Sequence, residues 1–435
     1  MLVKKIVIMS IPFLLFAESF NDIRLSIENS LKYKLAEQKV KIYEQKLKSA
    51  KAKNFGSLDL EYNAVHFFKQ PVMKLTTTQP VAVASDGVHL VYQTFNSELP
   101  MSDKNHFIGE ISFSYPLFTG FALSNLIEKS KLELIKEKLN LQNVKRELLL
   151  TSAELYSNIY ALKHQIMALE SAKKALLSAK DKAEALYNEG LINRSSLDEI
   201  NAKYYEVIAD IKNINSQKNS LLQTLSYLIN KPVKEIDGII DLNRLNFKPD
   251  FNKRPDVKAI KETLKISGED IKLAKSSYYP QVGLQIGLKR EADNLGLSDN
   301  DYQNIDKSYV AIGIKYNIFN GGETKAKVQM AKIAKLSRAI FLKDYLNKIK
   351  TDYENDLNTY NALFYRLKAA QQEIKARKSY YEYIKAKFDE GLADSSDLNS
   401  VIAKLAEAKA KRDAIKAKIF LLNVKLKLNG GEYEF

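Results

Sequence analysis

Tyr115-Pro-Leu-Phe-Thr-Gly120 and Tyr316-Asn-Ile-Phe-Asn-Gly321 are two versions of one short motif, 201 positions apart in a chain of 435 residues. A second landmark has the same spacing, because Glu189-Gly190-Leu191 returns as Glu390-Gly391-Leu392. Two landmarks at one offset indicate an internal duplication, which decides the architecture. The predicted organisation is a first repeat with a helix, two strands and a long helical hairpin at 18–230, a linker at 231–255 and a second repeat at 256–435.

A long uninterrupted segment follows each copy of the motif. Neither Gly nor Pro occurs from 121 to 188 or from 323 to 389, and apolar residues recur there at spacings typical of coiled-coil helices. After turns at Gly190 and Gly391 the same spacing continues in a shorter segment. The pattern in each repeat therefore predicts a helical hairpin whose long arm reaches on the order of 100 Å. A plain structural coiled coil also fits this pattern.

The segments before the long arms have a different period. Apolar and polar or small residues alternate strictly from 281 to 289 and from 310 to 318, and more weakly in Leu58 to Phe68 and Phe107 to Leu117. Runs of about ten alternating residues have the length and polarity of transmembrane barrel strands, and aromatic residues near their ends favour a membrane interface. Soluble antiparallel sheets alternate too, so the pattern alone leaves both alternatives open.

The number of strands limits how such a barrel could close. Four strands per chain are too few for a membrane barrel, and lipid does not tolerate open sheet edges. Several chains must then share one barrel. Two chains would supply eight strands around a filled interior, whereas three would supply twelve around an aqueous lumen.

The N-terminus predicts export from the cytoplasm. Lys4 and Lys5 precede an apolar run from Ile6 to Phe16 that ends at Ala17, as in a secretory signal peptide at 1–17. The run is too short to span a bilayer as a helix. Removing it lowers the formal net charge from +15 to +13 by the loss of two lysines. The remaining lysines alternate with acidic residues along the helices, so we expect no nucleic-acid partner.

No motif for catalysis or cofactor binding is visible. The histidines lack the spacing of a zinc site, and the chain has no cysteine. Phosphate-binding loops, dinucleotide fingerprints and nucleophile elbows are also missing from the sequence. We therefore expect no enzyme activity, no cofactor and no metal. The histidines are His66, His89, His106 and His164.

Taken together, the motifs resemble the TolC-like outer-membrane efflux proteins. The resemblance covers almost the whole chain and includes Arg254-Pro-Asp-Val257, Ser276-Ser-Tyr-Tyr-Pro280 and Ile318-Phe-Asn-Gly-Gly322. It implies a mainly α protein with a β-barrel part: a homotrimer that shares a twelve-stranded transmembrane barrel, with four strands per chain, above a periplasmic α-helical coiled-coil tunnel. Residues 69–106 and 290–307 would be extracellular loops, and 231–255 would join an equatorial belt.

The resemblance also implies a location, partners and a function. The protein would lie in the outer membrane, extend into the periplasm and contact lipid, a periplasmic adaptor protein and an inner-membrane pump of the RND or ABC type. It would be a passive exit duct for drugs and other toxic compounds. A channel for type I protein secretion is the main alternative, and a periplasmic adaptor or a structural coiled-coil protein fits the tandem hairpins less well.

A gate at the hairpin tips is implied by the same resemblance. Gly190, Leu191, Gly391 and Leu392 would form the tips that contact the adaptor. Asp397 matches the first acidic constriction position, whereas the second is Ser400, and Ala393 replaces a basic locking residue. The resemblance therefore implies a weak lock with an electronegative ring of Asp394 and Asp397, although Asp394 could simply cap a helix. The opposing hairpin contributes Ser195 and Ser196.

Overall fold

The computed structural model describes residues 17–238, 240, 242–298 and 306–433, so the expected signal peptide lies outside the described residues except for Ala17. The chain divides into two compact units. The helical unit comprises the described residues within Met1–Ile42, Leu134–Thr263 and Ser337–Phe435, and the sheet unit those within Tyr43–Glu133 and Leu264–Leu336. None of the helices in the described part has the length and apolarity needed to cross a membrane.

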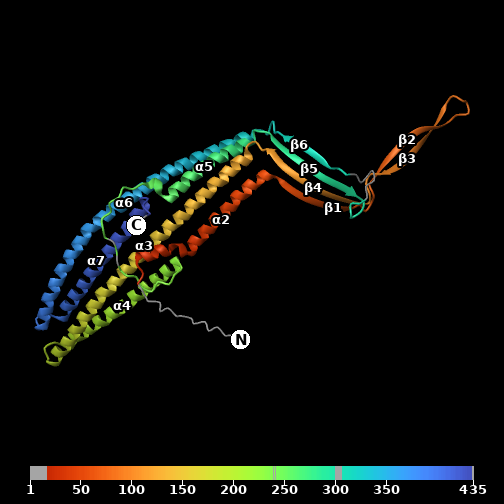
Figure 1. Ribbon diagram of the computed structural model, residues 1–435. Coiled ribbons are helices and arrows are strands. Elements are labelled where there is room, and N and C mark those ends of the chain that lie inside the picture. Colours follow the sequence, from red (N-terminus) through yellow and green to blue (C-terminus); the bar gives the residue numbers. More distant parts are fainter. Residues whose placement is uncertain (1–16, 239, 241, 299–305, 434–435) are drawn as a thin grey trace, which may run out of the picture. The chain divides into compact units, whose positions relative to one another are not determined.

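Figure 1 shows the order of the elements along the chain. The helices are α1 (Phe20–Ser26), α2 (Leu31–Ala52), α3 (Ala122–Asn188), α4 (Arg194–Ile229), α5 (Pro255–Ser276), α6 (Glu323–Asp389) and α7 (Ser395–Asn429), with short 3-10 turns at Ile27–Asn29, Lys53–Phe55 and Phe251–Lys253. The strands are β1 (Ser57–His66), β2 (Val72–Val83), β3 (Leu90–Pro100), β4 (Asn105–Phe118), β5 (Gln281–Ala292) and β6 (Tyr309–Lys315). The long arms α3 and α6 each contain 67 residues, as their freedom from Gly and Pro predicts.

The sheet unit contains one antiparallel sheet of four strands in the order β1-β4-β5-β6. Its register places Leu60, Ile111 and Leu288 in one row, and all three side chains are exposed. The adjacent row on the other face holds Glu61, Glu110 and Lys289. One face is therefore apolar and the other polar, as the alternation predicts for a strand between lipid and a lumen.

A glycine on the polar face makes room for an aromatic ring. Gly287 pairs with Tyr309, and a Cβ atom at Gly287 would lie 2.4 Å from a carbon of that ring. The Tyr309 hydroxyl donates a hydrogen bond to Glu110 at 3.0 Å. A side chain at position 287 would displace the ring and break this contact.

Two details of the strands differ from the prediction. Strand β6 ends at Lys315 rather than near Ile318, because its partner β5 begins at Gln281 directly after Pro280, which has no N–H group to donate. The predicted loop at 69–106 contains a second antiparallel sheet, the hairpin β2–β3. The first repeat therefore contains four strands where the sequence predicted two.

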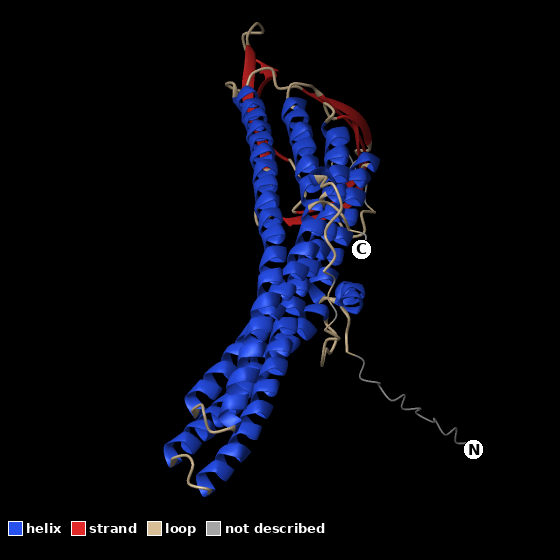
Figure 2. Ribbon diagram, turned by 90° about the vertical axis from the view of Figure 1, so that its left-hand side faces the viewer, coloured by secondary structure: helices blue, strands red, loops and turns tan. Residues whose placement is uncertain are grey.

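Two helical hairpins form most of the helical unit, and their turns lie at the same end (Figure 2). Three apolar clusters stabilise this unit, two of them between the hairpins and one within the second hairpin. One cluster centres on Tyr156, Ile159 and Leu225, another near the turns on Leu176, Ile200 and Leu398, and the last on Tyr360, Ile419 and Leu426. Of the apolar residues that recur along the first long arm, Leu148 and Ile159 are buried, whereas others such as Leu141 and Leu162 are half-buried in this chain.

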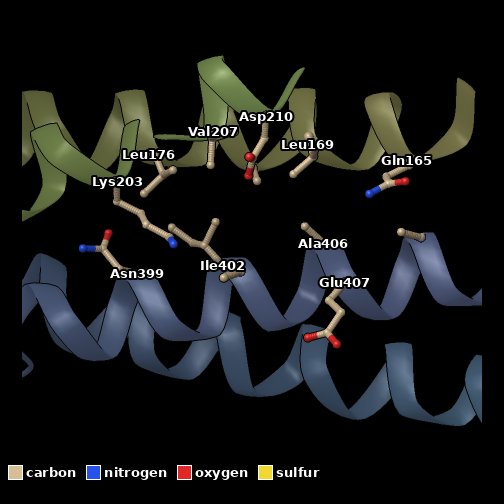
Figure 3. A pocket seen from close by; sticks show the side chains of 13 residues that line it. Gln165, Leu169, Leu176, Lys203, Val207, Asp210, Asn399, Ile402, Ala406 and Glu407 are labelled. Atoms are coloured by element: carbon tan, nitrogen blue, oxygen red, sulfur yellow. The ribbon is translucent and has the colours of Figure 1, made fainter. Parts of the chain in front are cut away.

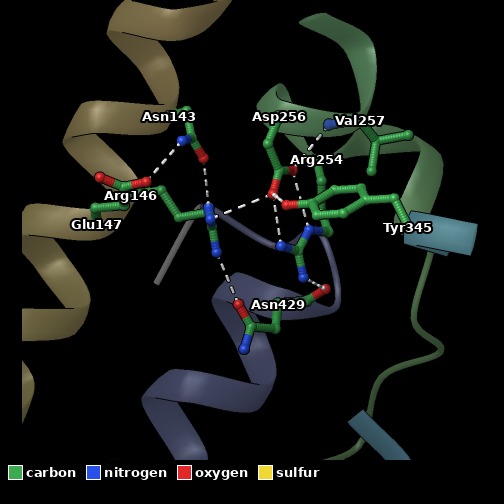
Figure 4. Close-up of polar contacts among 8 residues, drawn as sticks. All are labelled: Asn143, Arg146, Glu147, Arg254, Asp256, Val257, Tyr345 and Asn429. Carbon is green, nitrogen blue, oxygen red and sulfur yellow. Dashed lines mark hydrogen bonds and ion pairs between the residues drawn. The ribbon is translucent and has the colours of Figure 1, made fainter. Parts of the chain in front are cut away.

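A buried ionic cluster joins α3, α5, α6 and α7 in the same unit (Figure 4). The Asp256 carboxylate accepts hydrogen bonds from Arg254 at 2.6 and 3.1 Å, from Arg146 at 3.3 Å and from the Tyr345 hydroxyl at 2.8 Å. Arg146 also donates to the Asn429 side chain at 2.8 Å. This set, Asp256 with Arg254, Arg146, Tyr345 and Asn429, is called the ionic cluster below.

Burial alone would raise the pKa of Asp256. The hydrogen bond and charge of Arg254, the charge of Arg146 and the hydrogen bond of Tyr345 outweigh that effect and hold the pKa at about 2. Burial alone would lower the pKa of Arg254. The hydrogen bond and the charge of the Asp256 carboxylate outweigh this effect and raise the pKa overall. Asp256 is therefore ionised at neutral pH, and its carboxylate pairs with both neighbouring arginines, Arg146 and Arg254.

Candidate functional site

Both hairpin turns begin with the same backbone motif. Gly190 and Gly391 each have a φ of 75°, in the left-handed region that favours glycine. The next residue, Leu191 or Leu392, donates its N–H to the carbonyl group five residues earlier, at 2.8 and 2.7 Å. These bonds satisfy carbonyl groups at the ends of α3 and α6 and stop the helices there. Because a Cβ atom added at either glycine would meet no atom within 4 Å, the constraint is the φ angle.

The return helices begin with equivalent caps. The Asn193 side chain accepts a hydrogen bond from the N–H of Ser196 at 2.9 Å, and the Asp394 side chain accepts one from the N–H of Asp397 at 2.8 Å. The capping role considered for Asp394 is thus confirmed. Asp397 lies in the first turn of α7, where the helix dipole stabilises a negative charge.

The structure brings some of the expected gate residues together within one chain and leaves others apart. Asp394 and Asp397 are joined by the cap and are both exposed. The Ser196 hydroxyl donates to Asn193 at 3.1 Å rather than to the opposite hairpin. Ser195 is exposed and Ser400 half-buried, and neither side chain has a hydrogen-bond partner that we identify among the described residues.

One polar link between the hairpins was not predicted from the sequence. The Ser395 hydroxyl on α7 donates a hydrogen bond to Oε2 of Glu199 on α4 at 3.1 Å. Ser395 is only 2% exposed, whereas Glu199 lies at the surface. The two residues are 196 positions apart, so no local pattern could have paired them.

A cavity of about 210 Å³ lies between α3, α4 and α7, farther from the turns than the Ser395–Glu199 hydrogen bond (Figure 3). Apolar side chains such as Leu176 and Ile402 line it together with the charged groups of Lys203, Asp210 and Glu407. Asn399 also lines it, is 6% exposed and has no hydrogen-bond partner for either side-chain amide atom within the described chain. A buried amide without partners costs about 1–3 kcal/mol, so it weakens the packing of α7 on α4.

Near the turns the hairpins also share an apolar cluster, whereas farther along polar links join them again, such as the hydrogen bond from the Ser157 hydroxyl on α3 to the Ala417 carbonyl on α7 at 2.8 Å. Leu398 and Val401 on α7 pack in one cluster with Ile200 on α4 and Phe388 on α6. Apolar packing is not directional, so it can hold the hairpins together without fixing a single arrangement. Among the described residues, no group of three or more His, Cys, Asp or Glu side chains could hold a metal ion.

Comparison with known proteins gives a family match. A family model described as "Outer membrane efflux protein" matches residues 93–231 and 251–419. No curated protein gives a significant match.

Solved structures show the same fold at low identity. CusC is 14% identical, with a TM-score of 0.77 over 96% of this chain and 93% of that chain. VceC from Vibrio cholerae is 15% identical, with a TM-score of 0.72 over 95% and 96%. The CmeC outer membrane channel from Campylobacter jejuni is 16% identical, with a TM-score of 0.75 over 95% and 86%.

These matches confirm the predicted fold class, the resemblance and the outer-membrane location. A homotrimer with one shared twelve-stranded barrel is consistent with the family. The family and the fold are those of channels rather than enzymes. The protein is an exit duct of efflux pumps in the outer membrane. The chain belongs to the outer membrane efflux protein family.

Proposed function

We propose that the duct exports drugs and other toxic compounds, and that it works with a periplasmic adaptor and an inner-membrane pump of the RND or ABC type. The single observation that carries this proposal is that one chain contains two tandem helical hairpins and a four-stranded sheet with one apolar and one polar face. Nothing in the sequence supplies an energy-coupling motif, so we propose that the chain does no catalysis and that the pump provides the energy.

The tips of the hairpins are the proposed adaptor contact. Leu191 and Leu392 follow the two turn glycines and are 66% and 69% exposed. We propose that the leucines of the two tips together form one apolar contact surface for the adaptor. The double variant Leu191→Asp and Leu392→Asp should lose co-purification of the adaptor while the trimer stays intact. Retention of the adaptor would contradict this contact.

The proposed gate combines three features of these tips. Three copies of Asp397 around a common axis would form an electronegative ring that attracts cations. The Ser395–Glu199 hydrogen bond would hold the closed state, while Ala393 supplies no basic lock. Unpaired Asn399 would lower the cost of opening, because separation of α7 from α4 lets water reach its amide.

Conductance of the purified trimer in planar bilayers tests the duct and its gate. We expect cation-selective channels that multivalent cations block, and Asp397→Asn should reduce both properties. Asp352→Asn, an exposed change on α6, is the matched control. An unchanged selectivity in Asp397→Asn would remove Asp397 from the constriction, and a complete lack of conductance would reject the duct.

Gene deletion separates drug efflux from type I protein secretion. Drug efflux predicts that the deletion strain becomes more sensitive to antibiotics and bile salts without losing a secreted protein. Loss of one exported protein with unchanged drug sensitivity would favour the secretion channel instead.

A further inference from the structure

The hairpin β2–β3 has one polar and one apolar face. On the polar face the cross-strand pairs satisfy each other: Lys74 lies 3.3 Å from Glu98, Thr76 donates to Asn96 at 2.8 Å, and the hydroxyl groups of Thr78 and Thr94 lie 3.0 Å apart. The other face carries five large apolar side chains together with uncharged polar ones, which are Thr77, Gln79, Gln93 and Ser97. This apolar hairpin face consists of Met73, Leu75, Val91, Phe95 and Leu99.

Nothing in the described chain covers the apolar hairpin face. Its five side chains are 38–45% exposed. Among the residues that the structure describes, the two strands pair only with each other, and an isolated two-stranded sheet is at best marginally stable in water. A hairpin of 12 and 11 residues with such a face needs a packing partner.

The position of the hairpin in the sheet unit identifies that partner. The hairpin follows β1, which is an edge strand of the four-stranded sheet, after a connection of only five residues. In a barrel shared by three chains, the β1 edge pairs with the β6 edge of a neighbouring copy. The hairpin is therefore continuous with the seam between protomers.

The distances allow the copies to meet. Twelve tilted strands spaced about 4.8 Å apart give a barrel roughly 25 Å across, so three equivalent hairpins begin roughly 20 Å from one another. A strand of 12 residues is about 40 Å long. Each hairpin is thus longer than the gap to its neighbours, and tethering to one barrel makes their local concentration high.

We propose that the apolar hairpin faces of the three protomers pack against one another at the outer end of the barrel. The partner is a second copy of this chain, and the contact adds an extracellular interface to the seam between barrel strands. This inference rests on the trimeric duct proposed above.

Disulfide cross-linking tests the contact, and the chain is suited to it because it contains no native cysteine. Phe95→Cys places a thiol on the apolar hairpin face, and Thr94→Cys places one at the neighbouring position on the polar face. After mild oxidation of the purified trimer, we expect at least tenfold more cross-linked dimer from Phe95→Cys than from Thr94→Cys.

Native mass spectrometry of each variant distinguishes a failure of the hairpin packing from a failure of the trimeric duct on which it rests. If the variants are trimers and the two positions cross-link equally or not at all, the packing of hairpins is wrong and lipid or another protein covers the face. If no trimer forms even in the unmodified chain, the trimeric duct itself fails. Leu75→Cys provides a second position on the same face should Phe95→Cys not fold.

Discussion

Two buried polar regions of the helical unit differ in how fully they are paired. In the ionic cluster, Asp256 has two arginines and a tyrosine as partners, so burial leaves no charge uncompensated. Near the hairpin tips, Asn399 is as buried but lacks any partner among the described residues. The first arrangement fixes one packing of four helices, whereas the second makes the packing of α7 on α4 less costly to separate.

The ionic cluster should show the largest effect when it is broken. Asp256→Asn leaves Arg254 and Arg146 buried without their carboxylate, so we expect about 3–5 kcal/mol less stability. Unfolding of the detergent-solubilised protein by denaturant measures the loss. Asp352→Asn on the exposed side of α6 should change it by less than about 0.5 kcal/mol. A similar, small loss for both variants would mean that the ionic cluster does not hold the helices together.

Acid should weaken the same cluster. The pKa of Asp256 is lowered from 3.8 to about 2 in the folded chain, so its contribution is present above pH 4 and is lost as the pH falls through 2. The shift corresponds to about 2 kcal/mol, an order-of-magnitude value. The stability difference between the native chain and Asp256→Asn should therefore shrink by about that amount between pH 5 and pH 2. A difference that stays constant with pH would contradict the lowered pKa.

Removing the unpaired amide of Asn399 should increase the stability of the protein rather than decrease it. Asn399→Leu replaces it with an apolar group of similar size, so we expect about 1–2 kcal/mol more stability. The closed state of the channel should be stabilised by the same amount. The fraction of time that single channels are open should therefore fall about 5- to 30-fold. Asn399→Asp, which puts a charge into the same cavity, should act in the reverse direction. If Asn399→Leu opened more often, the amide would not be what eases the opening.

The smallest expected effect separates the two roles of Asp394. Asp394→Asn keeps the cap, as Asn193 does in the first repeat, but removes the charge. Asp394→Ala removes both and should cost about 1 kcal/mol. If Asp394 only caps α7, the Asn variant will keep native stability and native cation selectivity. Reduced cation selectivity in the Asn variant would mean that the charge of Asp394 belongs to the electronegative ring.

The sequence predicted the two helical hairpins and the four strands of the main sheet because their signals are local. Freedom from Gly and Pro gave the bounds of α3 and α6 to within one residue, and two-residue alternation located β1, β4, β5 and β6. The hairpin β2–β3 was missed because threonines, Pro80 and a bulge interrupt its alternation. At the tips, spacing identified the turns and the cap, but the link from Ser395 to Glu199 was not found.

By itself, the sequence indicated the repeated motifs, the helical hairpins, the strands of the main sheet and the family, since these depend on residue order over short distances. Only the tertiary structure decided which distant groups meet. Arg146 reaches Asp256 across 110 positions, and Asn399 is left without a partner among the described residues. The physical reason is that a helix fixes the direction of each side chain, whereas the neighbouring helix, in its final register, decides what that side chain meets.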